Sequence, residues 1–430
     1  MIFGSSGNLA RTRIIPAVRR LRSDGLLPDH YSVLGVDRKP AEGGGHVRGY
    51  RFLRGDFRSR STFSALGRLV RARTRRSGSA VIFYLATRPE LFPGIVSRLE
   101  EEGLSRSKLG RRSIMVEKPF GADLRSARVL ERRLRSAFPP RDIFRVDHFL
   151  AKAGTERIRQ ARFDSSALRP VWNRRFIDHV QIMADEGVDV GARGAFYDST
   201  GVVRDMIQNH LIQLLCLVAM ETPTSPSPAE VARSKACVLR AMRMPSAEEV
   251  VLGQYGGYAQ TIGVRRDSST PTFAAIRVGV DNARWRGVPF YLRTGKALAR
   301  TATEVVVVFR DPVLPSKGAS CGLASITFCI DPSADVIVEP RGEARAAPSE
   351  GPRKAEDEYE SLLLEALDGS QELFVDGRFN MLSWKVLAPL LTLEKTRSPR
   401  PAPYEPGTWG PSAADRLIAD DGRSWRDGRG

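Results

Sequence analysis

The sequence predicts an α/β Rossmann-like doubly wound parallel sheet, followed by a larger α+β domain with a mostly antiparallel sheet. In the first 150 residues, short apolar runs alternate with helical patterns, which is typical of parallel strands joined by crossover helices. From about residue 250 onward, strand patterns dominate and few helices separate them, which favours antiparallel pairing. We place the domain boundary between residues 1–146 and residues 147–430.

The expected elements of the first domain follow one another in regular alternation. The clearest strand is the apolar run AVIFYLA at 80–86, and the first expected helix ends at Gly25, a residue that favours helix ends. The other expected strands are Ile2-Phe3, 31–36, 113–119 and 142–149, and the expected helices are 9–25, 61–74, 91–103 and 123–138.

The second domain combines one long apolar helix with a series of strands. The helix at 206–220 is followed by the helix-breaking segment TPTSPSP (222–228). The polar stretch 341–357 is expected to be a loop, and helices are expected at 359–369 and 381–393. The expected strands are 179–186, 272–280, 288–294, 303–310, 324–330 and 335–340.

Composition limits the class of partner. The 430 residues include 67 Lys and Arg against 49 Asp and Glu, a net charge of +18, which suits phosphorylated substrates or a basic surface. No basic motif is interleaved with aromatic residues, so we expect no nucleic-acid partner. Four cysteines without a CxxC spacing indicate a reducing, cytoplasmic location and no metal site, and no apolar run is long enough to predict a membrane span.

A glycine-rich turn lies between the first strand and the first helix. Its residues are Gly4, Ser5, Ser6, Gly7, Asn8 and Leu9. Glycines let the backbone approach a pyrophosphate, which binds at the positive end of the following helix. The turn therefore predicts a dinucleotide-binding domain, although GSSG is also a common flexible linker.

The end of the second strand bears on the choice of coenzyme. Asp37, Arg38 and Lys39 follow the first glycine by about 30 residues. An acidic residue here accepts hydrogen bonds from the ribose of NAD, whereas an arginine accommodates the 2′-phosphate of NADP. The cations favour NADP, Asp37 leaves NAD open, and a polar hairpin tip is the alternative.

Seven segments, taken in order along nearly the whole chain, resemble the glucose-6-phosphate dehydrogenase family. The segments RVDHFLAK and GVVRDMIQNHLIQLLCLVAME are the most specific to it. The others are GSSGNLA (4–10), FYLATRP (83–89), EKPFGADL (117–124), DNARWRGVPFYLRTGKAL (281–298) and YEPGTWGP (404–411). The resemblance implies hydride transfer from C1 of glucose 6-phosphate to NADP, giving the phosphogluconolactone.

The resemblance implies that His210 is the catalytic base and that Asp205 orients it. Histidine suits removal of the O1 proton because its pKa lies near neutrality. On a regular helix, five residues place the two side chains about 140° apart, so Asp205 is expected to act from the helix start. The alternatives are that Asp205 caps this helix and that His210 is a satisfied core residue.

The remaining site residues are also implied by the resemblance. His148 and Lys152 hold the sugar phosphate, and they share a face if their segment is helical. Their alternative is a surface lysine beside a partly buried histidine. Lys118, Glu186 and Lys296 contact the sugar, and a cis bond precedes Pro119. The coenzyme residues are Gly4, Ser5, Ser6, Gly7, Asn8, Leu9, Arg38, Tyr84 and Lys118.

Some positions depart from the family pattern. Phe149 replaces a tyrosine, Asn8 replaces an aspartate, and Thr301 stands where the family has a second basic residue. Only three residues precede the glycine turn, which predicts either a start upstream or a weakened central strand. A related sugar dehydrogenase and a catalytically impaired binding or scaffold protein stay open, and the family implies a homodimer or homotetramer.

Overall fold

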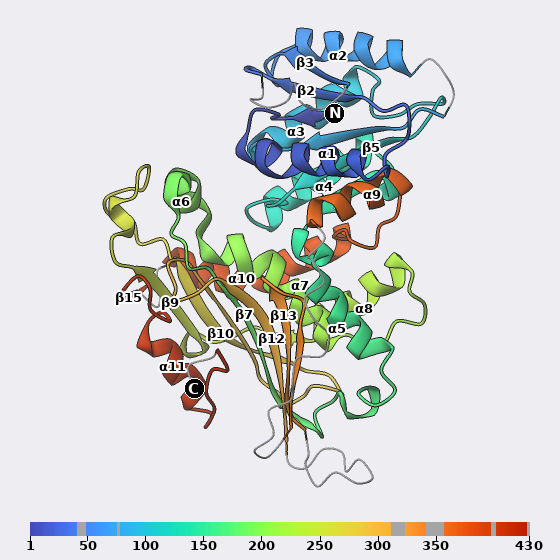
Figure 1. The fold of residues 1–430 in the computed structure, drawn as a ribbon. Coiled ribbons are helices and arrows are strands. Elements are labelled where there is room, and N and C mark those ends of the chain that lie inside the picture. The colour runs from blue at the N-terminus through green and yellow to red at the C-terminus, as the bar shows by residue number, and fades with distance from the viewer. Residues whose placement is uncertain (41–48, 75–77, 311–322, 341–356, 397–400, 428–430) are drawn as a thin grey trace. The chain divides into compact units, whose positions relative to one another are not determined.

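The computed structural model describes residues 1–430 except 41–48, 75–77, 311–322, 341–356, 397–400 and 428–430. The chain divides into two compact units, and each is described by itself. Unit 1 comprises Met1–Ala151 and Glu356–Met381, and unit 2 comprises Lys152–Ala355 and Leu382–Gly430. Figure 1 colours the chain from blue to red, so the orange α9 can be seen among the blue elements of unit 1.

Unit 1 contains a six-stranded parallel sheet in the order β3-β2-β1-β4-β5-β6. This doubly wound order confirms the predicted fold class for the first domain. The strands are β1 (Ile2–Phe3), β2 (Val33–Asp37), β3 (Tyr50–Arg54), β4 (Val81–Leu85), β5 (Arg112–Glu117) and β6 (Ile143–Val146). The helices are α1 (Ile15–Ser23), α2 (Arg60–Arg73), α3 (Phe92–Glu101), α4 (Leu124–Ala137) and α9 (Glu358–Asp368).

The two-residue strand β1 occupies the middle of this sheet. Ile2 pairs with Gly35 of β2 on one side and with Tyr84 of β4 on the other, both in parallel register. Phe3 packs against Phe63 with ring centroids 6.0 Å apart and is fully buried. Although β1 has only two residues, both are paired on each side, and the expectation of a weakened central strand stays a prediction.

Alternating side chains of the strands bury two apolar layers in unit 1. Ile2 and Tyr84 belong to a cluster that includes Tyr359 and Leu362 of α9. The adjacent residues along the strands point to the opposite face, where Phe83 packs against Phe138. Helix α9 thus completes the core of unit 1 although more than 200 residues separate it from β6.

Unit 2 contains a nine-stranded sheet with the path β14-β13-β12-β7-β11-β10-β9-β15 and β8 paired to β10. Among the strands that the structure describes, only β7 with β11 and β15 with β9 are parallel pairs in this sheet, so the predicted mostly antiparallel sheet is confirmed. The strands are β7 (Ile177–Asp185), β8 (Met242–Arg243), β9 (Val250–Tyr255), β10 (Phe273–Val280), β11 (Phe290–Gly295), β12 (Ala302–Phe309), β13 (Leu323–Asp331), β14 (Val336–Pro340) and β15 (Ala402–Tyr404).

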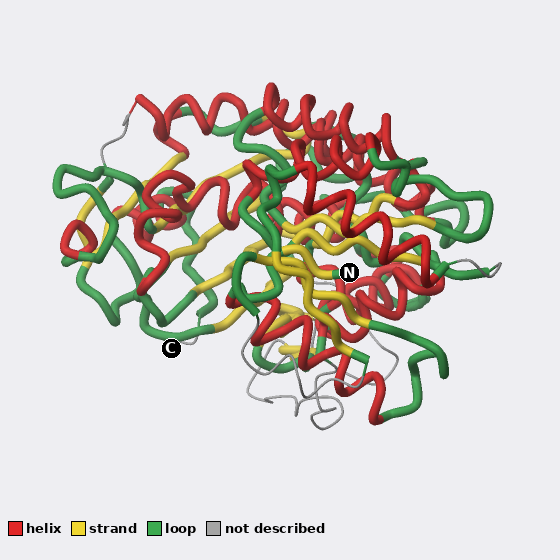
Figure 2. The backbone as a smooth tube through the Cα atoms, turned by 90° about the horizontal axis from the view of Figure 1, so that it is seen from above, coloured by secondary structure: helices red, strands yellow, loops and turns green. Residues whose placement is uncertain are grey.

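Helices cover both faces of the unit 2 sheet. On one face, Phe290 packs against Trp285, whose indole donates to the carbonyl of Ala219. On the other face, Tyr291 packs against Trp425, which follows α11. The helices of this unit are α5 (Ala153–Phe163), α6 (Gly194–Val202), η8 (Val203–Leu211), α7 (Ile212–Ala219), α8 (Pro228–Ala241), α10 (Gly377–Thr396, whose first residues belong to unit 1) and α11 (Ser412–Ala419). Figure 2 shows these helices in red and the strands in yellow.

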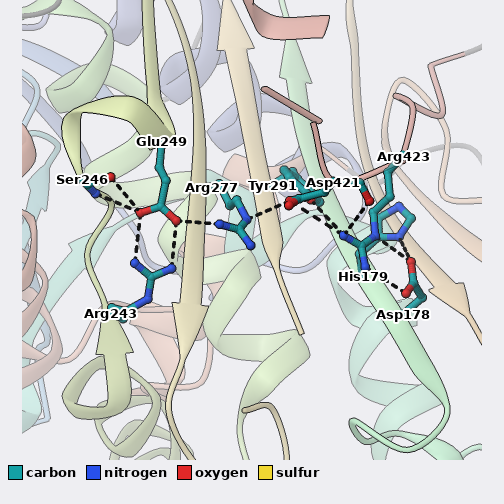
Figure 3. A network of polar contacts seen from close by, with 9 residues as sticks. All are labelled: Asp178, His179, Arg243, Ser246, Glu249, Arg277, Tyr291, Asp421 and Arg423. Atoms are coloured by element: carbon teal, nitrogen blue, oxygen red, sulfur yellow. Dashed lines mark hydrogen bonds and ion pairs between the residues drawn. The ribbon is translucent and has the colours of Figure 1, made fainter. Parts of the chain in front are cut away.

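A ladder of charged side chains crosses several strands of the same sheet (Figure 3). Glu249 accepts from Arg243 and from Arg277, whose guanidinium also pairs with Asp421 at 2.9 Å. At the other end, Arg423 donates two hydrogen bonds to the carboxylate of Asp178. Through these ion pairs and hydrogen bonds, the ladder attaches the C-terminal segment to the strands of the sheet.

Several expectations differ from the structure in position. The sequence predicts a single boundary at 146/147. In the structure the chain passes between the two units three times, because Glu356–Met381 returns to unit 1. Several elements have no counterpart among the expected ones: strands β3, β8, β9 and β15 and helices α5, α6, α8 and α11. The loop expected at 341–357 lies almost entirely outside the described residues. Among those described, no helix has both the length and the apolar character needed to cross a membrane.

Candidate functional site

The glycine turn of unit 1 forms a cradle whose backbone packs tightly against the end of β4. Gly4 adopts φ +81°, and a Cβ there would lie 2.5 Å from the carbonyl oxygen of Ala86. Gly7 donates its N–H to the carbonyl of Gly4, and Asn8 and Leu9 begin the helical segment that leads into α1. Glycine therefore lets the turn pack against Ala86 at the carboxyl edge of the parallel sheet, the edge at which a doubly wound fold binds a pyrophosphate.

A cavity of about 520 Å³ opens beside the turn, lined by residues from the ends of β1, β2, β3 and β4. Asp37 accepts from the N–H of Ser6 at 3.1 Å and from its hydroxyl at 2.6 Å. Arg38 lines the same cavity and donates to Asp56 at 2.6 Å. Ser5, by contrast, is fully buried. Asp37 and Arg38, the two residues that bear on the choice of coenzyme, therefore have different roles. Asp37 holds the glycine turn in place, whereas Arg38 forms part of the cavity wall.

Tyr84 lies inside unit 1 and is only 2% exposed. Its hydroxyl donates to Glu117 at 2.6 Å, and burial raises the pKa of Glu117 to about 7. Glu117 precedes Lys118, which is half-buried, and the Lys118–Pro119 bond is cis, as predicted. Tyr84 is thus placed to support the strand end that carries Lys118.

In unit 2, the ammonium of Lys296 lies between two carboxylates. It forms ion pairs with Glu186 and with Asp205, the latter at 3.4 Å, and its side chain is 3% exposed. The ring of Tyr197 lies 5.6 Å from the same nitrogen. The structure therefore brings together Lys296, Glu186 and Asp205, which lie up to 110 positions apart in the sequence. The resemblance assigns Lys296 and Glu186 to the sugar and Asp205 to orientation of the catalytic base.

The backbone around Lys296 is held from several sides. Tyr404 donates its hydroxyl to the Lys296 carbonyl at 2.7 Å, and Glu186 donates its N–H to the carbonyl of Gly295 at 3.0 Å. Ala297 adopts φ +52° and is 5% exposed, a conformation that costs a non-glycine residue about 1–3 kcal/mol. The surrounding contacts maintain a turn that fixes the position of Lys296.

His210 and Asp205 lie on η8, which is a π-helix rather than a regular α-helix. The i→i+5 pattern of a π-helix stacks residues five positions apart on nearly the same face. The expected 140° separation is therefore wrong, and Asp205 need not act from the helix start alone. His210 is fully buried, and its backbone N–H donates to the side chain of Asn209 at 2.7 Å. Segment η8 packs on β7 and β11, the strands that lead into Glu186 and Lys296.

His148 and Lys152 are not on one continuous helix. A short 3₁₀ segment spans His148–Ala151, and Lys152 has extended angles (φ −72°, ψ 135°) at the start of α5. The expected shared helical face is therefore wrong. His148 belongs to unit 1, where its ring stacks on Tyr359 at 6.5 Å. Lys152 belongs to unit 2, where it pairs with Asp331 at 3.3 Å and is 10% exposed.

Comparison with known families covers both units. The model of the glucose-6-phosphate dehydrogenase C-terminal domain matches residues 159–426, and the model of the NAD binding domain of the same family matches residues 1–51 and 42–156. The chain belongs to the glucose-6-phosphate dehydrogenase family. This confirms the resemblance drawn from the sequence motifs.

Individual members of the family are similar over nearly their whole length. Glucose-6-phosphate 1-dehydrogenase 2 of Mycobacterium tuberculosis is 36% identical, with 99% of this chain and 94% of that protein covered. The crystal structure of glucose-6-phosphate 1-dehydrogenase from Mycobacterium avium matches with a TM-score of 0.84 at 33% identity, covering 99% and 97% of the two chains. A glucose-6-phosphate dehydrogenase solved with its substrate glucose 6-phosphate matches with a TM-score of 0.86 at 29% identity, covering 99% and 98%.

Three residues of the site in this family member were not singled out from the sequence. Tyr197 and Tyr404 contact Lys296, and Asp56 contacts Arg38. Tyr404 begins the YEPGTWGP motif, so a signal for it was present. Nothing in the local sequence around Tyr197 points to a lysine 99 residues away, and nothing around Asp56 points to Arg38, which lies 18 residues earlier.

Proposed function

We propose that this chain oxidises glucose 6-phosphate at C1 with NADP, giving the phosphogluconolactone and NADPH. The observation that carries the proposal is the buried Lys296 between Glu186 and Asp205, next to the π-helical segment that holds His210. Such a cluster offers a sugar both hydrogen-bond donors and acceptors in a site largely closed to water.

The glycine cradle and the adjoining cavity fit NADP. A Cβ at Gly4 would occupy the space needed for close backbone approach, and Arg38 supplies a fork-shaped donor for a 2′-phosphate. Ser5, Ser6, Gly7, Asn8 and Leu9 complete the turn. When bound, NADP supplies the acceptor for the hydride that leaves C1.

His210 is proposed to take the proton from O1 of the sugar. A neutral imidazole can accept this proton, and the carboxylate of Asp205 stabilises the imidazolium that forms. Lys296 holds the carboxylate of Asp205 in position through the 3.4 Å ion pair.

Cations are proposed to bind the rest of the substrate. His148 and Lys152 would contact the 6-phosphate, for which Lys152 exchanges its contact with Asp331, a residue 42% exposed. Lys118, Glu186 and Lys296 would contact the sugar hydroxyls. We further propose that the chain acts in the cytoplasm as a homodimer or homotetramer.

A substrate panel tests the proposal. Purified protein is supplied with NADP and either glucose 6-phosphate, glucose or another hexose phosphate, and NADPH absorbance is followed. We expect turnover with glucose 6-phosphate far above that with glucose. Faster turnover with another sugar would favour a related sugar dehydrogenase, and no turnover with any of them would favour a binding or scaffold protein.

A further inference from the structure

The walls of the coenzyme cavity in unit 1 are electrically balanced although the chain carries a net charge of +18. Three arginines line the cavity, and three acidic residues line it as well. The arginines are Arg38, Arg58 and Arg88, and the acids are Asp37, Asp56 and Glu90. A pocket that takes a doubly charged phosphate gains from excess positive charge, so the three carboxylates call for an explanation.

Asp37 and Asp56 hold different partners. Asp37 accepts the N–H and hydroxyl of Ser6 on one oxygen and the N–H of Arg38, at 2.7 Å, on the other. Its two oxygens are therefore engaged by the backbone and the turn. Asp56 instead takes the guanidinium of Arg38 at 2.6 Å.

The pair between Arg38 and Asp56 lies at the surface and can exchange. The side chains are 70% and 41% exposed, respectively. The N–H of Arg58 and the guanidinium of Arg38 lower the pKa of Asp56, so its carboxylate is charged at neutral pH. A 2′-phosphate that binds Arg38 must share it with Asp56 or displace that carboxylate, and it also meets the repulsion of a second anion.

We propose that Asp56 sets how strongly this chain prefers a coenzyme with a 2′-phosphate over one without it. Asp56 engages Arg38 and offsets its charge, which weakens binding of the 2′-phosphate and leaves binding of the unphosphorylated ribose nearly unaffected. The proposal rests on the proposed function, because it assigns the cavity to NADP.

Asp56→Asn is a suitable test because the shape of the residue is kept. Oδ1 of Asp56 accepts the N–H of Arg58 at 2.8 Å, and the amide oxygen of asparagine can accept the same bond. Binding of 2′,5′-ADP and of 5′-AMP to the full chain is measured by calorimetry. We expect Asp56→Asn to lower the Kd of 2′,5′-ADP by about three- to fivefold and to change that of 5′-AMP by less than about twofold.

Two further variants separate a local effect from a change in net charge. Asp29→Asn removes the same charge from an exposed residue before β2, at the end of the strand opposite to the cavity, and should leave both Kd values unchanged. In an Arg38→Ala background, Asp56→Asn should tighten 2′,5′-ADP by less, because the competing pair is already absent and only the repulsion between carboxylate and phosphate is removed.

The outcomes distinguish this proposal from the proposed function. If the unmodified chain binds both ligands and Asp56→Asn leaves their ratio unchanged, the role of Asp56 is refuted while the coenzyme pocket stands. An equal gain in the Arg38→Ala background would likewise refute it. If the unmodified chain binds neither ligand, the coenzyme pocket is refuted and this proposal falls with it.

Discussion

Lys296 and His210 show how the chemistry of the site depends on single side chains. Lys296 is 3% exposed, and its burial is tolerable because Glu186 and Asp205 form ion pairs with it. His210 is buried on the neighbouring π-helical segment. In the proposed mechanism, Lys296 provides a fixed charge and His210 accepts the proton.

Replacement of His210 by asparagine tests the division of roles. Asparagine cannot accept the proton, so kcat should fall by about 10²–10⁴-fold while the KM for glucose 6-phosphate changes little. Steady-state kinetics with glucose 6-phosphate and NADP measure both constants. His179→Asn is the control, because His179 is also buried in unit 2 but bonds Asp178 and Gln181, so kcat should be kept. A kcat of His210→Asn within a few-fold of the original would mean that His210 is structural.

The strand–turn–helix element at the start of the chain is the part whose function was most predictable from local sequence. The order of strand, glycines and helix is short-range, so the motif predicted a phosphate cradle, with a flexible linker as the alternative. The π-helical form of η8 could not be predicted in this way, because its residues suit a regular helix equally well. The π-helical form of η8 occurs where the segment packs on β7 and β11, and local helix propensity does not specify it.

Gly4→Ala tests the cradle at the scale of this element. The new methyl group would meet the Ala86 carbonyl at 2.5 Å in addition to the strain of φ +81°. Gly25 is a matched control, since it has φ +70° but no atom within 4 Å of an added Cβ. We expect Gly4→Ala to weaken 2′,5′-ADP binding at least tenfold and Gly25→Ala to leave it unchanged, with a modest loss of stability of about 1 kcal/mol from the positive φ. Equal affinity in the two variants would contradict the cradle.

The charged ladder of Figure 3 predicts a dependence of stability on pH. Hydrogen bonds from Arg243 lower the pKa of Glu249 to about 2, from an ordinary value of 4.5. A depressed pKa stabilises the fold above the unfolded value, and this contribution is lost as the pH falls from about 4.5 through about 2.

Glu249→Gln should therefore reduce the free energy of unfolding at pH 7, and the difference from the unmodified chain should shrink below about pH 4.5. Denaturant unfolding at several pH values measures it. Glu248→Gln is the control, because Glu248 is exposed and forms no ion pair with any residue that the structure describes. A difference that stays constant down to pH 2 would contradict the assignment.

At the scale of the whole chain, the sequence predicted the two sheet types but not the path of the chain between units. Alternating apolar runs are local signals, so most strands and helices were found. The return of Glu356–Met381 to unit 1 depends on contacts of Tyr359, Leu362 and Phe374 with strands more than 200 residues earlier. The cluster of Lys296, Glu186 and Asp205 was predicted only through resemblance, because no local pattern links residues so far apart.

The returning segment gives a prediction about fragments. A fragment of residues 1–151 lacks α9 and exposes the apolar face that Tyr359 and Leu362 cover. Each buried side chain of this kind contributes about 1.5–3 kcal/mol, so the fragment should unfold at a lower denaturant concentration than the same fragment joined by a flexible linker to residues 356–381. Denaturant unfolding compares the two. Equal midpoints would mean that α9 adds nothing to unit 1.

Transfer of hydrogen from C1 to the coenzyme is the event that the proposed chemistry requires. Glucose 6-phosphate carrying deuterium at C1 is incubated with the full chain and NADP, and the reduced coenzyme is examined by mass spectrometry. The account predicts one deuterium in each NADPH formed. NADPH without deuterium, or no reduction of NADP at all, would contradict it.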